Sequence, residues 1–365
     1  MRPTVLVLRT RYPHWGGYSG IGQVLRYLDA AALDLLDRPV SDGDADFPIR
    51  SELVRAPLRR IVKARGMPWY GLSDLRAELH ALRRALSGAC DVVHYFDAEH
   101  TAQYLPGLLA RAPRLRTRTV ATFHQPPNEL AKLVRRSVVE RLTHVVLMSP
   151  DQRSFFEGLL PADRISVIPH GVDVDFFHPG EPSRTPTDSE TLQCLCVGHY
   201  LRDFRALGAV ARRLSGDPRF RFRVVSSQPT GLEALGNVSV ESGLDDRELR
   251  EAYQGADVLF LPLQACTANN ALLEGAACGL PVVSSDHASI RFYLPGEEAV
   301  LIRENDPDGF AEALLDLREH PERRARMSLA ARQRAEELRW SRIAPRYQKL
   351  YVDLSGASDK IGNHP

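Results

Sequence analysis

The segment 266–274 combines residue types that could bind phosphate groups beside hydroxyl groups. It reads Cys-Thr-Ala-Asn-Asn-Ala-Leu-Leu-Glu and follows the apolar run 255–263, which is typical of a buried strand. Because asparagine is a good N-cap, we expect a helix to begin near Asn269 or Asn270. The first-turn amides and the helix dipole would then form an anion site. Glu274 lies four residues after Asn270, on the same helix face, where it could accept hydrogen bonds from ribose hydroxyls.

A glycine and an arginine follow another strand-like run, 192–197. In Gly198-His-Tyr-Leu-Arg202 the guanidinium fork suits phosphate oxygens, and the alternative for Arg202 is a surface ion pair. Thr267 and Asn269 have the plain alternative of turn and cap residues, which is compatible with a phosphate site. Since a helix terminus and an arginine can supply positive potential, we expect no metal and no other cofactor.

Candidate acceptor-side residues follow strand-like runs in the first half. Gly16 and Gly17 would let the backbone approach a ligand closely, and the alternative is a plain turn. His124 ends a strand-like run, and Asp97 follows another; at the carboxyl ends of parallel strands both would face a crevice. A structural role is the alternative for each. The residues Tyr12, His14, Trp15 and Tyr18 crowd the glycine loop, as in an acceptor-binding lip.

The overall composition is that of a globular protein with no global charge. The chain has 365 residues, 44% hydrophobic and 25% charged, with 47 Lys and Arg against 46 Asp and Glu. This length predicts two domains, and the balance of charge argues against a nucleic-acid partner. The first apolar run is too short for a signal peptide, and five cysteines without C-x-x-C spacing indicate reduced thiols. We therefore expect a cytoplasmic protein.

Short apolar runs alternate with longer amphipathic stretches along the chain. The runs expected as strands are Val5–Leu8, Val92–Tyr95, Thr119–Phe123, Val145–Met148 and Ile165–Ile168, then Leu192–Val197, Phe220–Val225, Val238–Val240, Val258–Leu261, Pro281–Ser284 and Ala299–Ile302. This pattern predicts an α/β protein with two doubly wound, Rossmann-like domains. The proline-rich stretch 178–190 is the best candidate linker. We expect an acceptor-side domain over 1–175, a donor domain over 176–340 and a final helical segment over 341–365.

Several motifs together resemble the retaining glycosyltransferases of the GT-B fold, specifically the family-four group. That group's signature is E-x7-E followed by A-x-G-x-P-V-V. Its counterparts in this chain are Glu274 with Ala277-Cys-Gly-Leu-Pro-Val-Val283, Ile168-Pro-His-Gly-Val-Asp173 with Phe176-Phe-His-Pro179, the donor loop Gly198–Asp203, the pair Gly16-Gly17, and His124. The resemblance extends over nearly the whole chain. It implies two domains facing across a cleft, with the last helix returning to the first domain, and a nucleotide-diphosphate sugar as donor.

One position departs from the signature of the resembled family. The first glutamate of the pair would fall at residue 266, where this chain has Cys266, and a thiol is a much weaker hydrogen-bond partner than a carboxylate. The resemblance implies a hexosyl-type transferase that retains anomeric configuration, with His124, Arg202 and Glu274 in the catalytic site. Two alternatives stay open: a catalytically silent nucleotide-sugar-binding protein, and a GT-B-like epimerase or phosphorylase.

A basic run with apolar residues among the cations covers Arg50–Arg65. Its plain interpretation is a solvated helix or loop face. The sharper one is peripheral contact with anionic lipid at the inner face of the membrane, which would suit a lipid-linked acceptor. The residues do not identify the acceptor, which could be a saccharide, a lipid-linked sugar or a small metabolite.

Overall fold

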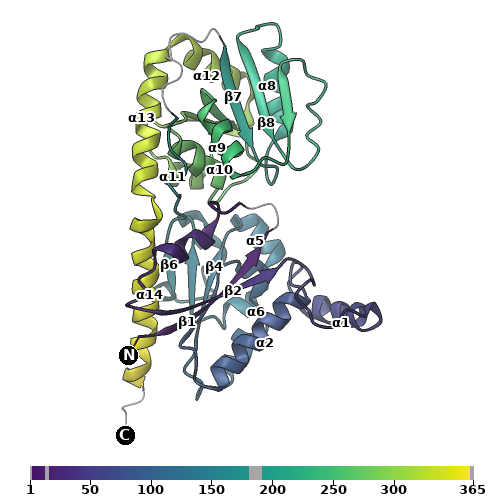
Figure 1. Cartoon of the computed structure of the whole chain (residues 1–365), viewed down its shortest axis with the longest axis vertical. Coiled ribbons are helices and arrows are strands. Elements are labelled where there is room, and N and C mark those ends of the chain that lie inside the picture. Colours follow the sequence, from purple (N-terminus) through teal and green to yellow (C-terminus); the bar gives the residue numbers. More distant parts are fainter. Residues whose placement is uncertain (1, 13–15, 181–190, 362–365) are drawn as a thin grey trace. The chain divides into compact units, whose positions relative to one another are not determined.

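The computed structural model describes residues 2–12, 16–180 and 191–361, and the chain divides into two compact units (Figure 1). Unit 1 comprises Met1–Trp15, Ile21–His170 and Ser341–Pro365; unit 2 comprises Gly16–Gly20 and Gly171–Trp340. The boundaries expected from the sequence were 175/176 and 340/341. Two differences stand out: the main division falls after His170, and the short segment Gly16–Gly20 is grouped with unit 2.

The core of unit 1 is a parallel sheet of six strands in the order β2-β1-β3-β4-β5-β6. The strands are β1 (Thr4–Arg11), β2 (Asp34–Ser41), β3 (Val92–Tyr95), β4 (Arg118–Phe123), β5 (His144–Leu147) and β6 (Ile165–Val167). Five of them match expected runs. β2 was not expected, because an edge strand with one polar side carries charges and tolerates Pro39, and so lacks the continuous apolar pattern.

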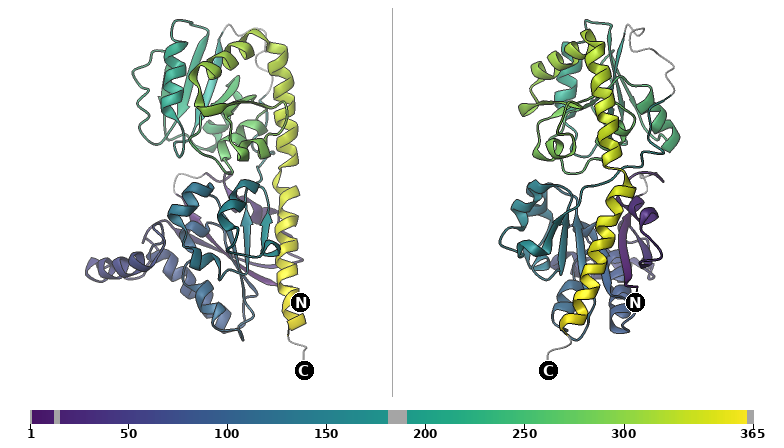
Figure 2. Two further views of the ribbon diagram at one scale, coloured as in Figure 1. Left: turned by 180° about the vertical axis from the view of Figure 1, so that it is seen from behind. Right: turned by 90° about the vertical axis from the view of Figure 1, so that its left-hand side faces the viewer.

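The helices of unit 1 flank this sheet, apart from α1 (Glu52–Arg65), which extends away from it (Figure 2). The helices are α1, α2 (Leu72–Leu86), α3 (Ala98–Thr101), α4 (Leu105–Ala110), α5 (Pro127–Leu133), α6 (Arg136–Val139) and α7 (Arg153–Phe156), with the 3-10 turns η1 (Ile21–Tyr27), η2 (Pro150–Gln152) and η3 (Ala162–Arg164). The long helix α14 (Trp340–Ile361) contributes all but its first residue to this unit. The hydroxyl of its buried Tyr351 is hydrogen-bonded to Nδ1 of His94 in β3, at 2.7 Å.

Unit 2 is a second six-stranded parallel sheet, in the order β12-β11-β10-β7-β8-β9. Its strands are β7 (Leu192–Val197), β8 (Phe220–Val225), β9 (Val238–Glu241), β10 (Val258–Leu261), β11 (Val282–Ser285) and β12 (Ala299–Ile302), and all six match expected runs. The strand order reverses between β7 and β10. In doubly wound sheets, ligands bind at the carboxyl ends of the two strands at such a switch point.

The helices of unit 2 are α8 (Phe204–Arg213), α9 (Asp246–Gln254), α10 (Asn270–Ala277), α11 (Ala288–Tyr293), α12 (Pro307–Glu319) and α13 (Pro321–Glu337), with the 3-10 turn η4 (Arg303–Asn305). The helix α10 is buried along its length after Asn270 and packs on β10. Gly275 makes this close approach possible, because a Cβ there would lie 2.7 Å from Leu259 Cδ2. The fold prediction of two Rossmann-like domains is confirmed.

Candidate functional site

Two loops of unit 2 meet at the switch point between β7 and β10. One loop is 198–203, after β7, and the other is 262–269, after β10. Main-chain hydrogen bonds join them: Asp203 N donates to Pro262 O at 2.8 Å, and Gln264 N donates to Leu201 O at 2.9 Å. The loops therefore form one platform at the carboxyl end of the sheet, where the sequence placed the donor-binding residues.

Arg202 lies on this platform with its guanidinium turned toward the start of α10. Its Nε donates to Val197 O at 2.8 Å and its Nη1 to Tyr200 O at 3.1 Å, which fixes the plane of the fork. Its Nη2 is 3.3 Å from Asn269 Oδ1. Gly198 has φ 89°, and a Cβ there would lie 2.8 Å from Nη2, so glycine gives the guanidinium room to lie against the backbone. Arg202 forms no ion pair with another residue in the part of the chain that the structure describes, so the surface ion pair considered for it is not seen there.

The N-terminus of α10 has the cap that the sequence predicted. Asn269 is the N-cap, and its Oδ1 accepts from Leu272 N at 3.2 Å. Asn270 is the first helical residue. The side chain of Thr267 is buried, and its Oγ1 has no hydrogen-bond partner among the residues that the structure describes. A buried hydroxyl without a partner is uncommon, and it leaves a polar atom for a ligand beside the helix terminus.

Cys266 is buried beside this terminus. Its Sγ lies 3.1 Å from Thr267 O, and its carbonyl accepts from Ser289 Oγ at 2.9 Å. The side chain is therefore held by local contacts on the short loop before α10. A thiol in this place can contribute shape and weak hydrogen bonding to a bound group, but no negative charge comparable to a carboxylate.

Glu274 is the buried carboxylate of the platform. Its Oε1 accepts from Ser19 Oγ at 2.6 Å and its Oε2 from Tyr253 OH at 2.9 Å. Burial raises the pKa of Glu274, and these two hydrogen bonds oppose the rise. The carboxylate is thus held in one orientation by two hydroxyl donors, which the sequence reasoning did not identify. Tyr253 could have been noticed as the last apolar position of the amphipathic pattern over 246–253.

The glycine pair lies in unit 2, whereas the sequence grouped it with the first domain. Gly17 N donates to Asp246 Oδ2 at 2.7 Å, and a Cβ on Gly16 would overlap the same carboxylate. The Tyr18 ring stacks on Phe176, with centroids 3.6 Å apart. The backbone approach expected of these glycines is made here to the N-terminal end of α9. An acceptor contact for Gly16 and Gly17 stays a prediction.

A network of hydrogen bonds, here called the polar brace, links the loops that form the platform to neighbouring parts of the sheet. Asp203 caps α8 by accepting from Ala206 N at 3.0 Å, and it also accepts from Asn305 Nδ2 at 2.8 Å. Asn305 Nδ2 also donates to Leu263 O at 3.0 Å, while Ser285 Oγ bonds Asn305 Oδ1 and accepts from Leu263 N at 2.6 Å. The brace ties together loops after β7, β10, β11 and β12. No local pattern in the sequence predicts it, because its members are far apart along the chain.

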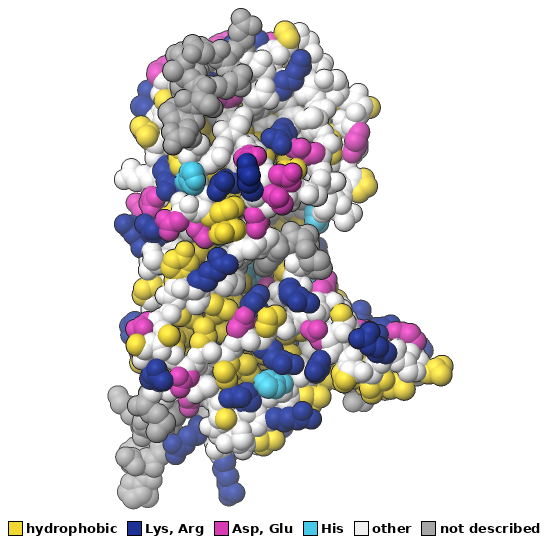
Figure 3. All heavy atoms as spheres, viewed as in Figure 1, with side chains coloured by type: hydrophobic (Ala, Val, Ile, Leu, Met, Phe, Trp, Pro, Cys, Tyr) yellow, Lys and Arg dark blue, Asp and Glu magenta, His cyan; other side chains and the backbone are white. Residues whose placement is uncertain are grey.

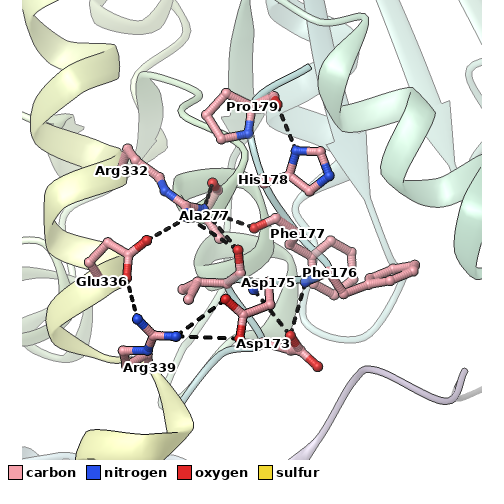
Figure 4. A network of polar contacts seen from close by, with 11 residues as sticks. Asp173, Asp175, Phe176, Phe177, His178, Pro179, Ala277, Arg332, Glu336 and Arg339 are labelled. Carbon is pink, nitrogen blue, oxygen red and sulfur yellow. Dashed lines mark hydrogen bonds and ion pairs between the residues drawn. The ribbon is translucent and has the colours of Figure 1, made fainter. Parts of the chain in front are cut away.

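The part of the motif segment that lies in unit 2, residues 171–179, is anchored by α13 and by Arg339 (Figure 4). Arg332 donates to the carbonyls of Val174 and Phe177, at 3.2 and 3.0 Å, and to Ala277 O at 2.7 Å. The last of these places a cation at the C-terminus of α10, where the helix dipole favours it. Arg339 pairs with Asp175 at 3.2 Å. These contacts fix α10 at the end opposite the platform.

In unit 1, His124 lies at the carboxyl end of β4. Its Nε2 is 2.7 Å from Phe96 O, so this nitrogen donates a hydrogen bond to that carbonyl and Nδ1 is the nitrogen that can accept one. The Nε2 is also 4.0 Å from Asp97 Oδ1. Asp97 is buried and accepts from Thr10 N at 2.8 Å, so the structure brings these two predicted residues together beside β1. Both face the switch point of this sheet, between β1 and β3.

Glu99 and His100 complete this group in unit 1. Glu99 is buried, accepts from the main-chain nitrogens of His124 and Gln125, and has a pKa raised by burial. The His100 ring packs against Trp69 at 4.8 Å and against Tyr12 at 5.7 Å. Of the expected aromatic lip, His14 and Trp15 lie outside the described residues, as does 181–190 of the expected linker.

No group of three His, Cys, Asp or Glu side chains that could hold a metal occurs within 2–12, 16–180 and 191–361. The sequence has an Asp-x-Asp spacing at 173–175. Its first carboxylate binds main-chain amides, because Asp173 Oδ1 accepts from Asp175 N at 3.2 Å and from Phe176 N at 3.0 Å. Arg202 is a cation that the platform holds beside the start of α10.

Two family models match the chain and together cover well over half of it. The model described as Glycosyltransferase Family 4 matches residues 25–176, and the one described as Glycosyl transferases group 1 matches residues 194–320. The chain belongs to the group 1, family 4 glycosyltransferases. It is accordingly a nucleotide-sugar-dependent glycosyltransferase, as the sequence motifs predicted.

Curated relatives of this glycosyltransferase are named D-inositol 3-phosphate glycosyltransferases. That of Frankia alni is 28% identical over 297 residues, which is 68% of this chain and 72% of the relative. That of Saccharomonospora viridis is 24% identical and the alignment covers 98% of this chain and 95% of the relative.

Solved structures share the fold at lower identity. Sucrose-phosphate synthase from Thermosynechococcus elongatus superposes with a TM-score of 0.72 at 17% identity, over 98% of this chain and 100% of that one. Anabaena HepE, in complex with UDP and glucose, has a TM-score of 0.65 at 12% identity, over 95% of this chain and 99% of that one. These likenesses support the fold of the glycosyltransferase as a whole.

Proposed function

We propose that this glycosyltransferase binds the diphosphate of its donor at the N-terminus of α10, between Arg202 and the first-turn amides. The observation that carries the proposal is the 3.3 Å contact of Arg202 Nη2 with Asn269 Oδ1, which holds a guanidinium beside the helix cap at the switch point. Both features favour a negative charge at the same place. The buried Thr267 hydroxyl adds a hydrogen-bonding group there.

Glu274 is proposed to accept hydrogen bonds from the ribose of the donor. The hydroxyls of Ser19 and Tyr253 occupy one position on each carboxylate oxygen, and each oxygen has capacity for a second bond. Cys266 is proposed to lie beside the donor sugar, where it shapes the pocket without accepting strongly. The sugar would then depend on neighbouring backbone groups for the contacts that a carboxylate makes elsewhere in the family.

The proposed reaction retains anomeric configuration. The bond from the anomeric carbon to the phosphate oxygen breaks, the acceptor oxygen bonds to that carbon on the same face, and the acceptor proton passes to the departing phosphate. Arg202 and the α10 amides would stabilise the charge that develops on the phosphate. His124 is proposed to contact a donor or acceptor hydroxyl through Nδ1. Because these groups supply the positive potential, activity is expected to persist in the presence of a chelator.

An inositol phosphate is the acceptor to test first, because the relatives that match most of the chain are named for it. UDP is the first nucleotide to test, since a structure of the same fold was solved with it. A cytoplasmic location is proposed from the cysteines: all five are buried thiols outside disulfides, which suits a reducing compartment.

The test is a thermal-shift and calorimetric screen of UDP, GDP, ADP, TDP and their sugars. A nucleotide that stabilises the wild type and the control Arg205→Ala, but not Arg202→Ala or Glu274→Ala, supports the donor site. Arg205 is a suitable control because it is an exposed arginine three residues away. If no nucleotide binds, or if both variants bind the nucleotide as well as the wild type does, the proposed donor site is wrong.

The same protein samples separate the alternative activities. Donor binding without transfer or hydrolysis for any acceptor would indicate a silent nucleotide-sugar-binding protein. Conversion of the donor sugar without an acceptor would indicate an epimerase, and a requirement for free phosphate in place of a nucleotide would indicate a phosphorylase. Transfer with retained configuration, read from the anomeric coupling of the product, is the expected result.

A further inference from the structure

The helix α1 presents an apolar face to solvent. Leu53, Pro57 and Ile61 recur at intervals of four residues, so they line one side of the helix. Leu53 is 89% exposed and Ile61 is 56% exposed, and Val54 beside them is exposed as well. Figures 1 and 2 show α1 extending away from the sheet of unit 1, at the end of α2. This stripe is therefore not covered by the unit's own core.

The side of α1 that packs inward carries both cations and apolar residues. Arg55 and Arg59 both pair with Asp44, and Leu58 and Val62 join a small cluster with Tyr70. The orientation of α1 is thus fixed by partly exposed cations that pair with Asp44 and by Leu58 and Val62, which leaves the side with Leu53 and Ile61 toward solvent. The exposed stripe is a consequence of this specific packing and not of a frayed or loosely held segment.

Cations border the exposed stripe. Arg60 and Lys63 are exposed, and neither side chain forms an ion pair with any residue that the structure describes. Figure 3 shows apolar and basic side chains together on the arm that carries α1. The charge of the whole unit has the same sign: unit 1 has 28 Lys and Arg against 19 Asp and Glu, a formal charge of +9, whereas unit 2 has 19 against 27, or −8.

We infer that α1 is a docking element for an anionic lipid surface. Apolar side chains would enter the boundary of the acyl chains while Arg60 and Lys63 meet the headgroup phosphates. A second copy of the chain would suit the stripe less well, because two such faces would bring their bordering cations together. No helix among the described residues is long and apolar enough to cross a membrane, so the contact would be peripheral.

The test is co-sedimentation of the full chain with vesicles, without nucleotide, so that its outcome is independent of the donor site. Binding is expected to vesicles of phosphatidylcholine with phosphatidylglycerol, and to be weak with phosphatidylcholine alone. Arg60→Glu and Lys63→Glu should each weaken binding about fivefold or more. The double substitution Leu53→Ser with Ile61→Ser should weaken it about tenfold or more, since these side chains supply the apolar insertion.

Matched controls lie on α13 in unit 2. Leu329 is 74% exposed and Arg326 is exposed, so Leu329→Ser and Arg326→Glu also change an exposed leucine and an exposed arginine. Both are expected to bind vesicles like the wild type. The inference is overturned if the wild type binds neither vesicle, or if the α1 variants bind as well as the controls. It is also overturned if sedimentation equilibrium shows a dimer that Leu53→Ser with Ile61→Ser dissociates, which would assign the stripe to a second copy.

Discussion

At the scale of single residues, Arg202 has the clearest geometric role. Three of its nitrogens contact protein oxygens, so little side-chain entropy is left to lose when a phosphate binds. A lysine could not reproduce this fork, because its ammonium is a point charge on a flexible stem. Arg202 therefore supplies a positive charge whose hydrogen-bond donors are held in a fixed orientation.

Arg202→Ala is expected to lower kcat by about 10²–10³-fold, the usual effect of removing one preorganised donor to a developing oxyanion. Arg202→Lys should recover only part of the loss, while Arg205→Ala should stay close to wild type. Steady-state kinetics with the donor found in the nucleotide screen would measure this. An unchanged kcat in Arg202→Ala would show that the leaving phosphate is stabilised by other groups.

Cys266 and Glu274 should differ strongly in what they contribute to donor affinity. Cys266→Ala is expected to change the Kd of the nucleotide sugar less than about threefold, because a thiol makes only weak hydrogen bonds. Glu274→Ala should raise it more than about tenfold, since it removes a buried acceptor and leaves the hydroxyls of Ser19 and Tyr253 without their carboxylate. Calorimetric titration of both variants with the nucleotide sugar measures the two Kd values. A large effect at Cys266 would assign the thiol a direct role at the sugar.

At the scale of elements, Asn269 connects the stability of α10 with the proposed binding of the diphosphate. Asn269 caps the helix and also accepts from Arg202, while Arg332 holds the carbonyl of Ala277 at the other end. The helix is short and almost wholly buried, so its direction is set by these ends and by its packing on β10.

Two substitutions at Asn269 should separate the cap from the anion site. Asn269→Ala is expected to cost about 1 kcal/mol of stability through loss of the cap. Asn269→Asp keeps a capping oxygen, so its stability should stay near wild type, but its negative charge should weaken nucleotide-diphosphate binding. Urea unfolding and calorimetry on the two variants give the comparison. Equal nucleotide affinity in Asn269→Asp and wild type would place the diphosphate elsewhere.

At the scale of the whole molecule, the two units have separate cores and opposite charge. Unit 1 contains the buried histidines His94 and His144 together with buried carboxylates such as Glu78 and Glu99, whereas unit 2 buries Glu274 and four of the five thiols. Burial lowers the pKa of His144 to about 4, and the pKa of His94 well below its ordinary value. A fall in pH should therefore destabilise unit 1 before unit 2.

The direction of this pH effect follows from the difference in the pKa of a histidine between the folded and the unfolded state. Folded His144 has a lower pKa than the unfolded residue, so its contribution to stability is present above about pH 6.5 and is lost as the pH falls toward about 4. His144→Gln keeps a side-chain amide near Ser166 but cannot take up a proton. Its loss of stability between pH 7 and pH 5 should be about 1 kcal/mol smaller than that of wild type, after allowance for partial solvent screening. Calorimetric melting at several pH values measures it, and parallel curves for the two proteins would contradict the assignment.

The sequence by itself determined the features that depend on neighbours along the chain. Eleven apolar runs became strands, and the start of α10 fell at the asparagine cap, because strand periodicity and capping are local properties. The exception, β2, lies at a sheet edge, where an apolar pattern is not needed. The sequence also brought together the motifs that identified the family.

Only the tertiary structure decided which distant groups meet. Gly16–Gly20 belongs with unit 2 because Asp246, Phe176 and Glu274 hold it there, and no pattern within five residues could predict this. The basic run at 50–65 was uniform in sequence, but packing divided it into inward cations that pair with Asp44 and outward cations beside an apolar stripe. Hydrogen bonds and ion pairs between residues more than a hundred positions apart depend on the folded path of the chain, which local propensity does not encode.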